Sequence, residues 1–197
     1  MSTMEGTLRT LCVVMAYLLG SIPSAVIAGR RHGVDIRAVG DGNMGARNVT
    51  RMIGPVPGTV VAVCDFLKGV VAVSVAVLLQ LPRSWTLAAA WAAIIGHDFP
   101  VFAQLRGGQG LATTFGCLFV LMPLETSVAL GLFGALYLMT RNPDVSAGIG
   151  LGCGLLLAWW SDRPAALLAH AVCLLLFIPL KKMLDRRRRA AAQTGSC

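Results

Sequence analysis

The chain has 197 residues, of which 56% are hydrophobic and 13% are charged, whereas an average soluble domain is about one quarter charged. Its mean hydropathy is +0.72, so there are too few polar residues to cover a soluble globule. In a soluble protein the formal charge of +8 would suggest a nucleic-acid partner. In a chain this apolar we interpret it as a membrane-orientation signal instead, and we expect no nucleic-acid partner.

The first apolar run, from Leu11, resembles a signal peptide but ends in no clear cleavage site, so we expect it to be a retained first span. The six cysteines show no CxxC or Cys/His spacing. A cysteine in an apolar stretch usually acts as a small hydrophobic residue. We therefore expect neither a metal site nor a structural disulfide.

Apolar runs between charged and turn residues predict an all-α, polytopic membrane protein with about seven transmembrane helices. The predicted spans are 8–29, 55–81, 84–104, 110–123, 125–140, 144–160 and 164–180. The stretch 110–140 is compatible either with one long helix or with two short helices divided at Pro123. We expect one transmembrane domain over 1–183 and a basic, disordered cytoplasmic tail over 184–197.

With seven spans, most of the 17 basic residues fall on one side of the membrane. The larger group comprises Arg30, Arg31, Arg37, Arg47, Arg51, Arg106, Arg141, Lys181, Lys182 and Arg186 to Arg189. Only Arg9, Arg83 and Arg163 fall on the other side, and Lys68 lies within a span. The positive-inside rule then predicts an outside N-terminus and a cytoplasmic C-terminus. The run at 186–189 is typical of an orientation signal that contacts anionic lipid.

Two predicted inner loops are rich in glycine. The first, GRRHGVDIRAVGDGNMGARNVTRMIG (29–54), combines tight turns with arginines, a pattern suited to phosphate. An ordinary basic cytoplasmic loop explains it equally well. The second, RGGQGLATT (106–114), precedes an apolar helix, so its amides and the helix dipole could bind a phosphate. Close packing is the alternative there, and the spacing of a Walker A loop is missing.

Polar residues within spans are costly in hydrocarbon and are candidates for function. Asp65 and Lys68 stand three residues apart, so they share a helix face and could form an ion pair. His97 lies near the inner end of the third predicted span. Ser21 and Ser24 flank Pro23, where serines more often serve packing or a kink than catalysis.

The ordered motifs YLLGSIPSAVIAG (17–29), DIRAVGDGNMGARNVTRMIG (35–54), CDFLKG (64–69) and GHDFPVFAQLRGGQGLATTFG (96–116) resemble those of the bacterial acyl-phosphate-dependent glycerol-3-phosphate acyltransferases of the inner membrane. A weaker match covers 140–150. The resemblance implies seven helices, a cytoplasmic active site and no cofactor. It also implies acyl transfer from acyl phosphate to the 1-hydroxyl of sn-glycerol 3-phosphate, which gives lysophosphatidic acid and phosphate for phospholipid biosynthesis. The expected partners are these substrates and membrane lipids, and the oligomeric state is left open.

The resemblance also suggests roles for individual positions. Ser21 and Arg37 match a serine and an arginine that the family requires, and Lys68 matches the lysine of the family's DxxKG element; these three are our expected catalytic residues. The expected substrate-binding residues come from both loops, the third predicted span and the weaker match. They are Asn43, Gly45, Asn48, His97, Arg106, Gly107, Gly108, Gly110, Thr113 and Ser146.

Several positions depart from the family pattern. Gln109 replaces a lysine of the usual KGGKG, Asp41 replaces a serine and Arg47 a threonine, and the C-terminal motif is not found after Leu174. Arg47 could restore the charge lost at Gln109. These departures keep open a family-derived protein without this catalysis that binds lipid phosphates or partners. A third alternative is an anion or lipid transporter, but this chain lacks the two similar halves that are typical of such proteins.

Overall fold

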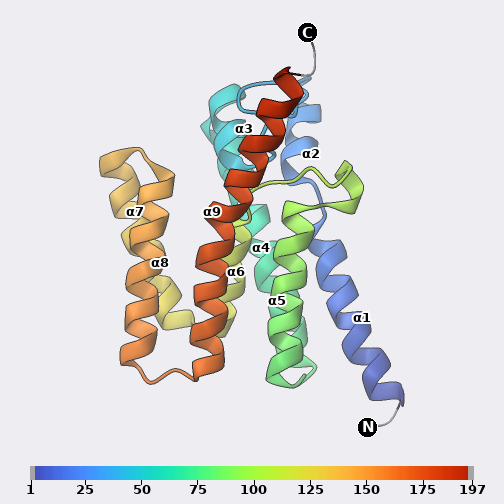
Figure 1. Cartoon of the computed structure of the whole chain (residues 1–197), viewed down its shortest axis with the longest axis vertical. Helices are drawn as coiled ribbons and strands as arrows, with labels where there is room; N and C mark the ends of the chain where they lie inside the picture. The colour runs from blue at the N-terminus through green and yellow to red at the C-terminus, as the bar shows by residue number, and fades with distance from the viewer. Residues whose placement is uncertain (1–2, 195–197) are drawn as a thin grey trace. The chain divides into compact units, whose positions relative to one another are not determined.

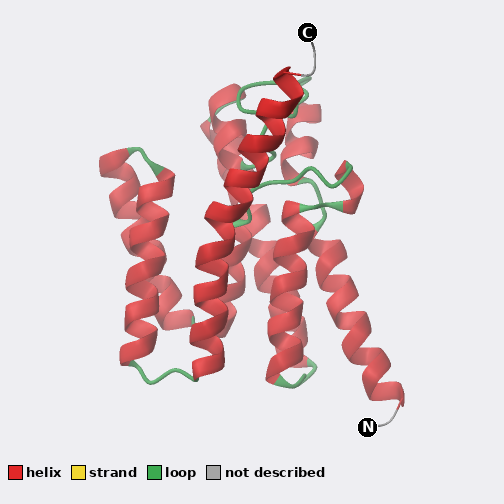
Figure 2. Ribbon diagram, in the orientation of Figure 1, coloured by secondary structure: helices red, strands yellow, loops and turns green. Residues whose placement is uncertain are grey.

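A computed structural model describes residues 3–194. Helices joined by loops make up this part of the chain, with no strand among the described residues (Figure 2). The prediction of an all-α protein is therefore confirmed. The chain divides into two compact units at residues 124 and 125, and each is described by itself. One domain over 1–183 with a tail over 184–197 stays a prediction.

The described residues of unit 1 form six α-helices and one short 3-10 helix. They are α1 (Thr3–Gly20), α2 (Ser24–Arg31), α3 (Ala46–Met52), α4 (Pro55–Leu78), α5 (Arg83–Asp98), η1 (Val101–Ala103) and α6 (Leu111–Leu121). α1 packs along α5, and α4 packs along α6. The short helices α2 and α3 lie at one end of the unit, and α1 begins at the other (Figure 1).

The first predicted span is broken at Pro23. α1 ends at Gly20 and α2 begins at Ser24, because proline cannot donate a backbone hydrogen bond and disfavours a helical conformation in the preceding residue. Ser21 remains tied to α1, since both its amide and its hydroxyl donate to the Tyr17 carbonyl. The break places irregular backbone inside an otherwise apolar segment.

Reciprocal glycine contacts bring the helices of unit 1 together. A methyl group added at Gly20 would lie 2.1 Å from a backbone oxygen of α5, and one at Gly96 would lie 2.2 Å from a backbone oxygen of α1. Between α4 and α6 the corresponding distances are 2.3 Å at Gly69 and 2.0 Å at Gly116. Small residues commonly allow such close approach between membrane helices. Both pairs of helices are therefore in backbone contact.

Unit 2 consists mainly of α7 (Pro123–Thr140), α8 (Pro143–Trp160) and α9 (Ala165–Thr194). The stretch 110–140 is thus two helices, α6 and α7, separated just before Pro123. Arg163, in the loop after α8, binds the buried Glu125 of α7 through two hydrogen bonds of 2.7 and 3.2 Å. These hydrogen bonds raise the pKa of the Arg163 guanidinium. Lys182 of α9 pairs with Asp144 in the first turn of α8.

Within the described part of the chain, five helical segments are long and apolar enough to cross a membrane: 3–31, 55–78, 83–103, 123–140 and 165–188. α6 has 11 residues and rises only about 16 Å, roughly half of a hydrocarbon core. α8 has 18 residues but is not among the five. The seven-span count and the orientation of the termini therefore stay predictions. α9 continues to Thr194, past the predicted start of the tail.

We expect Gly116→Val to destabilise the protein by at least 1–3 kcal/mol, about the cost of overpacking a well-packed core. The added side chain would meet backbone atoms of α4, which cannot move aside. Gly152→Ala in α8 is the matched control, because nothing lies within 4 Å of its added methyl group. Thermal unfolding in detergent measures both variants. An unchanged melting temperature for Gly116→Val would show that the close approach is not required.

Candidate active site around Asp65

A buried carboxylate in the middle of α4 gathers three polar side chains. Oδ1 of Asp65 accepts hydrogen bonds from Nζ of Lys68 at 2.7 Å and from Oγ of Ser24 at 2.8 Å. Nδ1 of His97, in the last turn of α5, lies 3.6 Å from the same oxygen. The ion pair expected from the sequence between Asp65 and Lys68 is present, and both side chains are at least nine-tenths buried.

The break at Pro23 supplies one side chain and one backbone carbonyl to this cluster. Asp65 and Lys68 share a face of α4 because residues three apart on a helix are neighbours. Ser24 is the first residue of α2 and donates to Asp65 across the two helices. The Ile22 carbonyl, which the break leaves without a helical donor, accepts a hydrogen bond of 2.5 Å from Nζ of Lys68. The lysine therefore satisfies both the carboxylate and the interrupted backbone.

The glycine loop packs directly on His97. The Gly108 amide donates to the His97 carbonyl at 3.2 Å. A methyl group at Gly107 would lie 2.1 Å from that carbonyl oxygen, and one at Gly108 would lie 2.2 Å from Nε2 of the imidazole. Gly110 has a φ of 67° and starts α6 from the left-handed region, which glycine adopts without strain. Three of the loop's glycines are thus required by contacts or by backbone conformation.

The side chains and the loop enclose a small cavity. Its lining includes Ser24, Asp65, Lys68, His97, Gly107 and Gly108. Thr113, in the first turn of α6, donates from Oγ1 to the Asp65 carbonyl at 3.0 Å and so fixes the start of α6 against α4. The cavity is therefore walled by parts of α2, α4, α5 and the loop before α6.

An apolar groove of about 570 Å³ runs beside the cavity, between α4 and the segment formed by α1 and α2. Its walls are mostly aliphatic, with Ile27, Val60 and Val71 among them. Ser24 and Lys68 line both the groove and the cavity. The groove therefore meets a buried ammonium group, an arrangement that suits a molecule with an apolar chain and an anionic group.

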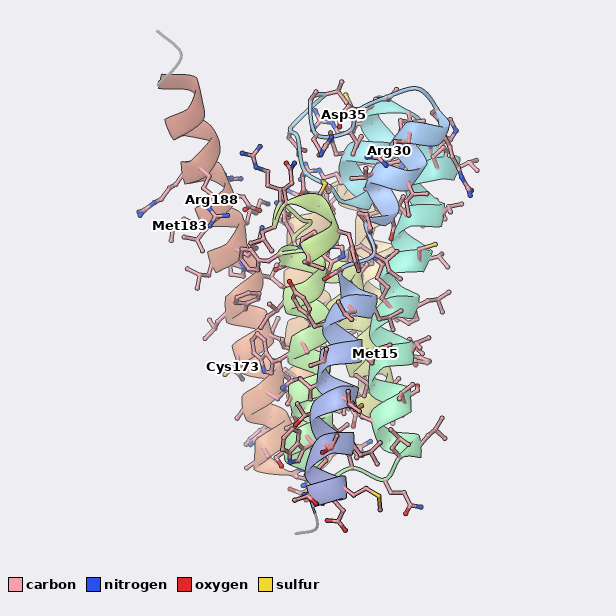
Figure 3. All side chains as sticks on the ribbon, turned by 90° about the vertical axis from the view of Figure 1, so that its right-hand side faces the viewer. Met15, Arg30, Asp35, Cys173, Met183 and Arg188 are labelled. Atoms are coloured by element: carbon pink, nitrogen blue, oxygen red, sulfur yellow. The ribbon has the colours of Figure 1, made fainter. Side chains whose placement is uncertain are left out.

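Arg37 lies in a different hollow of unit 1. Its Nε and Nη2 atoms donate to the two oxygens of Asp35 at 2.9 and 3.0 Å. These hydrogen bonds hold the pKa of the exposed Asp35 carboxyl below its usual value. Arg30 and Gly33 line this hollow with Arg37, and Figure 3 shows Arg30 and Asp35 near the same end of the unit. The residues around it do not overlap those around Lys68.

Asn48 shapes the first inner loop from within. Its fully buried amide donates to the carbonyls of Ile36 and Val39, both at 3.1 Å, and accepts from the Asp41 amide at 3.3 Å. Oδ1 of the buried Asn43 has no hydrogen-bond donor among the described residues. Asn48 therefore organises the loop, whereas Asn43 retains an acceptor for a ligand.

Other expected site residues lie apart from the cavity lining. Ser21 is fully buried, with its hydroxyl on the Tyr17 carbonyl. Arg106 is exposed in the glycine loop. Gly45 immediately precedes α3. Ser146 belongs to unit 2, where its buried hydroxyl donates to the Asn142 carbonyl at 2.8 Å.

The structure thus brings together Lys68, His97, Gly107 and Gly108, with Thr113 beside them. Ser24 and Asp65 belong to the same cluster but were not among the expected site residues. An ionisable residue in an apolar span was a signal for Asp65. No comparable signal distinguished Ser24 from Ser21.

We expect Gly108→Ala to reduce any activity of this site at least tenfold, because its methyl group would displace the imidazole of His97. Gly148→Ala in α8 is the control, since nothing lies within 4 Å of the added methyl group and alanine favours a helix. Steady-state kinetics on folded variants compare the two. Equal activity of both variants would contradict the assignment of the loop to the site.

Comparisons with known proteins agree with the motifs. The family model for glycerol-3-phosphate acyltransferase matches residues 10–190. Glycerol-3-phosphate acyltransferase 1 of Dehalococcoides mccartyi is 37% identical over 183 residues, covering 89% of this chain and 88% of the relative. Glycerol-3-phosphate acyltransferase 1 of Deinococcus radiodurans is 44% identical over 142 residues, covering 72% of this chain and 71% of the relative.

Two crystal structures of PlsY (YgiH), an integral membrane glycerol 3-phosphate acyltransferase, are also similar. The glycerol 3-phosphate form superposes with a TM-score of 0.83 at 29% identity, covering 93% of this chain and 92% of that chain. The lysophosphatidic acid form gives a TM-score of 0.81 at 28% identity, with the same coverage. From these matches and its own apolar helices, the chain is a membrane protein that belongs to the glycerol-3-phosphate acyltransferase family.

Proposed function

We propose that this protein transfers a fatty acyl group from acyl phosphate to the 1-hydroxyl of sn-glycerol 3-phosphate, and so supplies lysophosphatidic acid for phospholipid biosynthesis. The observation that carries this proposal is the position of Lys68, where the apolar groove meets the polar cavity. Acyl phosphate has both a long apolar chain and a phosphate, so its chain suits the groove and its phosphate suits the ammonium group of Lys68. The similar crystal structures, in glycerol 3-phosphate and lysophosphatidic acid forms, correspond to a substrate and the product.

Electrostatics and positioning supply the catalysis in this proposal. Phosphate is already a good leaving group, so preorganised cations that neutralise it lower the barrier. An ammonium has three N–H donors, and Lys68 uses two of them for Asp65 and Ile22. The third is available to a phosphate oxygen. Arg37 and Arg106 would neutralise further phosphate charge, and Ser21 would accept a hydrogen bond from substrate.

The remaining expected site residues keep binding roles within this proposal. The backbone of the glycine loop would hold glycerol 3-phosphate, because successive amides before a helix suit an anion. Asn43 offers its buried amide oxygen to a substrate hydroxyl. The residues assigned to substrate binding are Asn43, Gly45, Asn48, His97, Arg106, Gly107, Gly108, Gly110, Thr113 and Ser146.

The proposal places the protein in the cell's inner membrane, with seven helices, an outside N-terminus and the active site at the cytoplasmic face. The basic residues from Arg30 to Arg51 support this orientation, because they lie at the end of unit 1 that carries α2 and α3. Glycerol 3-phosphate and acyl phosphate would both reach the site from that side.

We expect the purified protein to release phosphate and form lysophosphatidic acid from the two substrates. Lys68→Met keeps the side chain's bulk but removes its charge. It should lower kcat/KM at least a hundredfold, the effect of losing one well-placed charged donor.

Arg37→Ala should also lower kcat/KM. Arg37→Lys should retain only part of the wild-type kcat/KM, because lysine lacks the planar fork of arginine. Wild-type turnover in folded Lys68→Met and Arg37→Ala would refute these roles. No release by the wild-type protein above a denatured control would favour the non-catalytic alternative.

We expect Cys64→Trp to shorten the acyl chains that the enzyme accepts, because Cys64 lines the groove four residues before Lys68. KM should rise severalfold for a long-chain acyl phosphate and stay near the wild-type value for a short-chain one. Cys173→Trp is the control, since this cysteine is likewise exposed but lies on α9 of unit 2 (Figure 3). An equal effect on both chain lengths would argue against an acyl groove here.

A further inference from the structure

Arg30 and Arg37 line the same hollow because the chain reverses direction after α2. The Val34 amide donates to the Gly29 carbonyl at 2.9 Å. The Gly33 amide donates to the Arg30 carbonyl at 3.2 Å. With Gly33 at a φ of 69°, these two hydrogen bonds form a Schellman motif, a common way to end a helix. The returning chain brings Arg37 back to a hollow of about 270 Å³ that Arg30 also lines.

The segment that carries Arg37 is anchored by its neighbour in the sequence. Ile36 is fully buried in a hydrophobic cluster that includes Val49. Its carbonyl accepts a hydrogen bond of 3.1 Å from the buried amide of Asn48. Asp35 and Arg37, on either side of Ile36, are both exposed. The burial of Ile36 therefore fixes the backbone from which these two charged side chains extend.

Asp35 binds both the backbone and the side chain of Arg37. Its Oδ1 accepts from the Arg37 amide at 3.1 Å and from Nε at 2.9 Å. Its Oδ2 accepts from Nη2 at 3.0 Å. The Asp35 carbonyl accepts from the Ala38 amide at 2.9 Å. Because the carboxylate is part of this turn, it cannot leave the guanidinium without also breaking the turn.

The pairing with Asp35 occupies one edge of the Arg37 guanidinium. A guanidinium has five N–H donors in a planar fork that fits a carboxylate or a phosphate. Asp35 covers the edge formed by Nε and Nη2. The Arg37 side chain is 37% exposed, so a ligand can reach the second edge, formed by Nη1 and Nη2. A phosphate group suits that edge, because its oxygens can accept two parallel hydrogen bonds.

We infer that Asp35 is a positioning residue, which holds Arg37 so that the Nη1–Nη2 edge binds the phosphate group of a substrate in the hollow shared with Arg30. The inference rests on the proposed acyltransferase activity and deepens it. An arginine that is ordered before the substrate arrives loses less conformational entropy on binding. The same contact therefore contributes more to affinity when Asp35 is present.

A double-mutant cycle isolates this positioning effect. Asp35→Asn keeps an Oδ1 acceptor for the turn but replaces the acceptor of Nη2 with a donor. It also removes the direct repulsion between the carboxylate and a phosphate, but that repulsion does not depend on Arg37 and cancels in the cycle. Arg37→Ala should weaken binding at least tenfold in the otherwise wild-type protein, as expected for charge-assisted hydrogen bonds. In the Asp35→Asn background it should weaken binding threefold or less.

Calorimetric titration in detergent measures binding without turnover. One arm uses glycerol 3-phosphate and the other a non-hydrolysable acyl phosphonate, because both substrates carry a phosphate group. The arm in which Arg37→Ala weakens binding identifies the substrate whose phosphate the hollow holds.

Glu5→Gln is the matched control for Asp35→Asn. Glu5 is also an exposed carboxylate paired with an arginine, since it lies 3.3 Å from Arg9. It belongs to the first turn of α1, at the end of unit 1 away from α2 and α3 (Figure 1). Arg37→Ala should weaken binding by the same factor in Glu5→Gln as in the otherwise wild-type protein.

Three results would overturn the inference. An equal loss of affinity from Arg37→Ala in the Asp35→Asn background would mean that Arg37 binds without its partner. A larger loss there would mean that Asp35 competes with the phosphate for Arg37. No loss from Arg37→Ala in either arm would mean that the hollow holds no substrate phosphate. Wild-type protein that binds as expected but forms no lysophosphatidic acid would instead refute the proposed function.

Discussion

One carboxylate oxygen organises the polar part of unit 1. Oδ1 of Asp65 accepts hydrogen bonds from Lys68 and Ser24 and lies near His97. A charge buried among apolar helices is very costly unless cations and donors surround it. α2, α4 and α5 must therefore approach one another at this level. The same requirement concentrates reactive groups where the apolar groove begins.

The break at Pro23 makes this arrangement possible. A continuous helix from Thr3 to Arg31 would pair the Ile22 carbonyl with a backbone amide and leave Lys68 with the carboxylate alone. The interruption leaves that carbonyl with the Ser24 amide as its backbone donor, and Lys68 donates a second hydrogen bond to it, as irregular backbone inside a membrane requires. The carbonyl at the break and the ammonium group of α4 thus satisfy each other's hydrogen-bonding needs.

Local patterns predicted much of this structure. Apolar runs located most helices, the three-residue spacing predicted the ion pair of Asp65 with Lys68, and the clustered glycines marked the loop on His97. The choice of Ser24 over Ser21 could not be predicted, because the residues flank the same proline and only the helix direction after the break decides. Asn48 matched a binding motif, yet its contacts with Ile36 and Val39 show a role in loop folding. Such roles depend on three-dimensional contacts that spacing does not encode.

The reciprocal glycines also bear on how this chain can change over evolution. At an ordinary helix interface, a larger side chain on one helix can be accommodated by a smaller one opposite. Gly20, Gly96, Gly69 and Gly116 each face a backbone oxygen, and no substitution makes a backbone smaller. A second mutation on the facing helix therefore cannot make room for a larger side chain at any of these four positions. Lineages that diverge freely along the groove walls should keep the spacing between α4 and α6 nearly fixed.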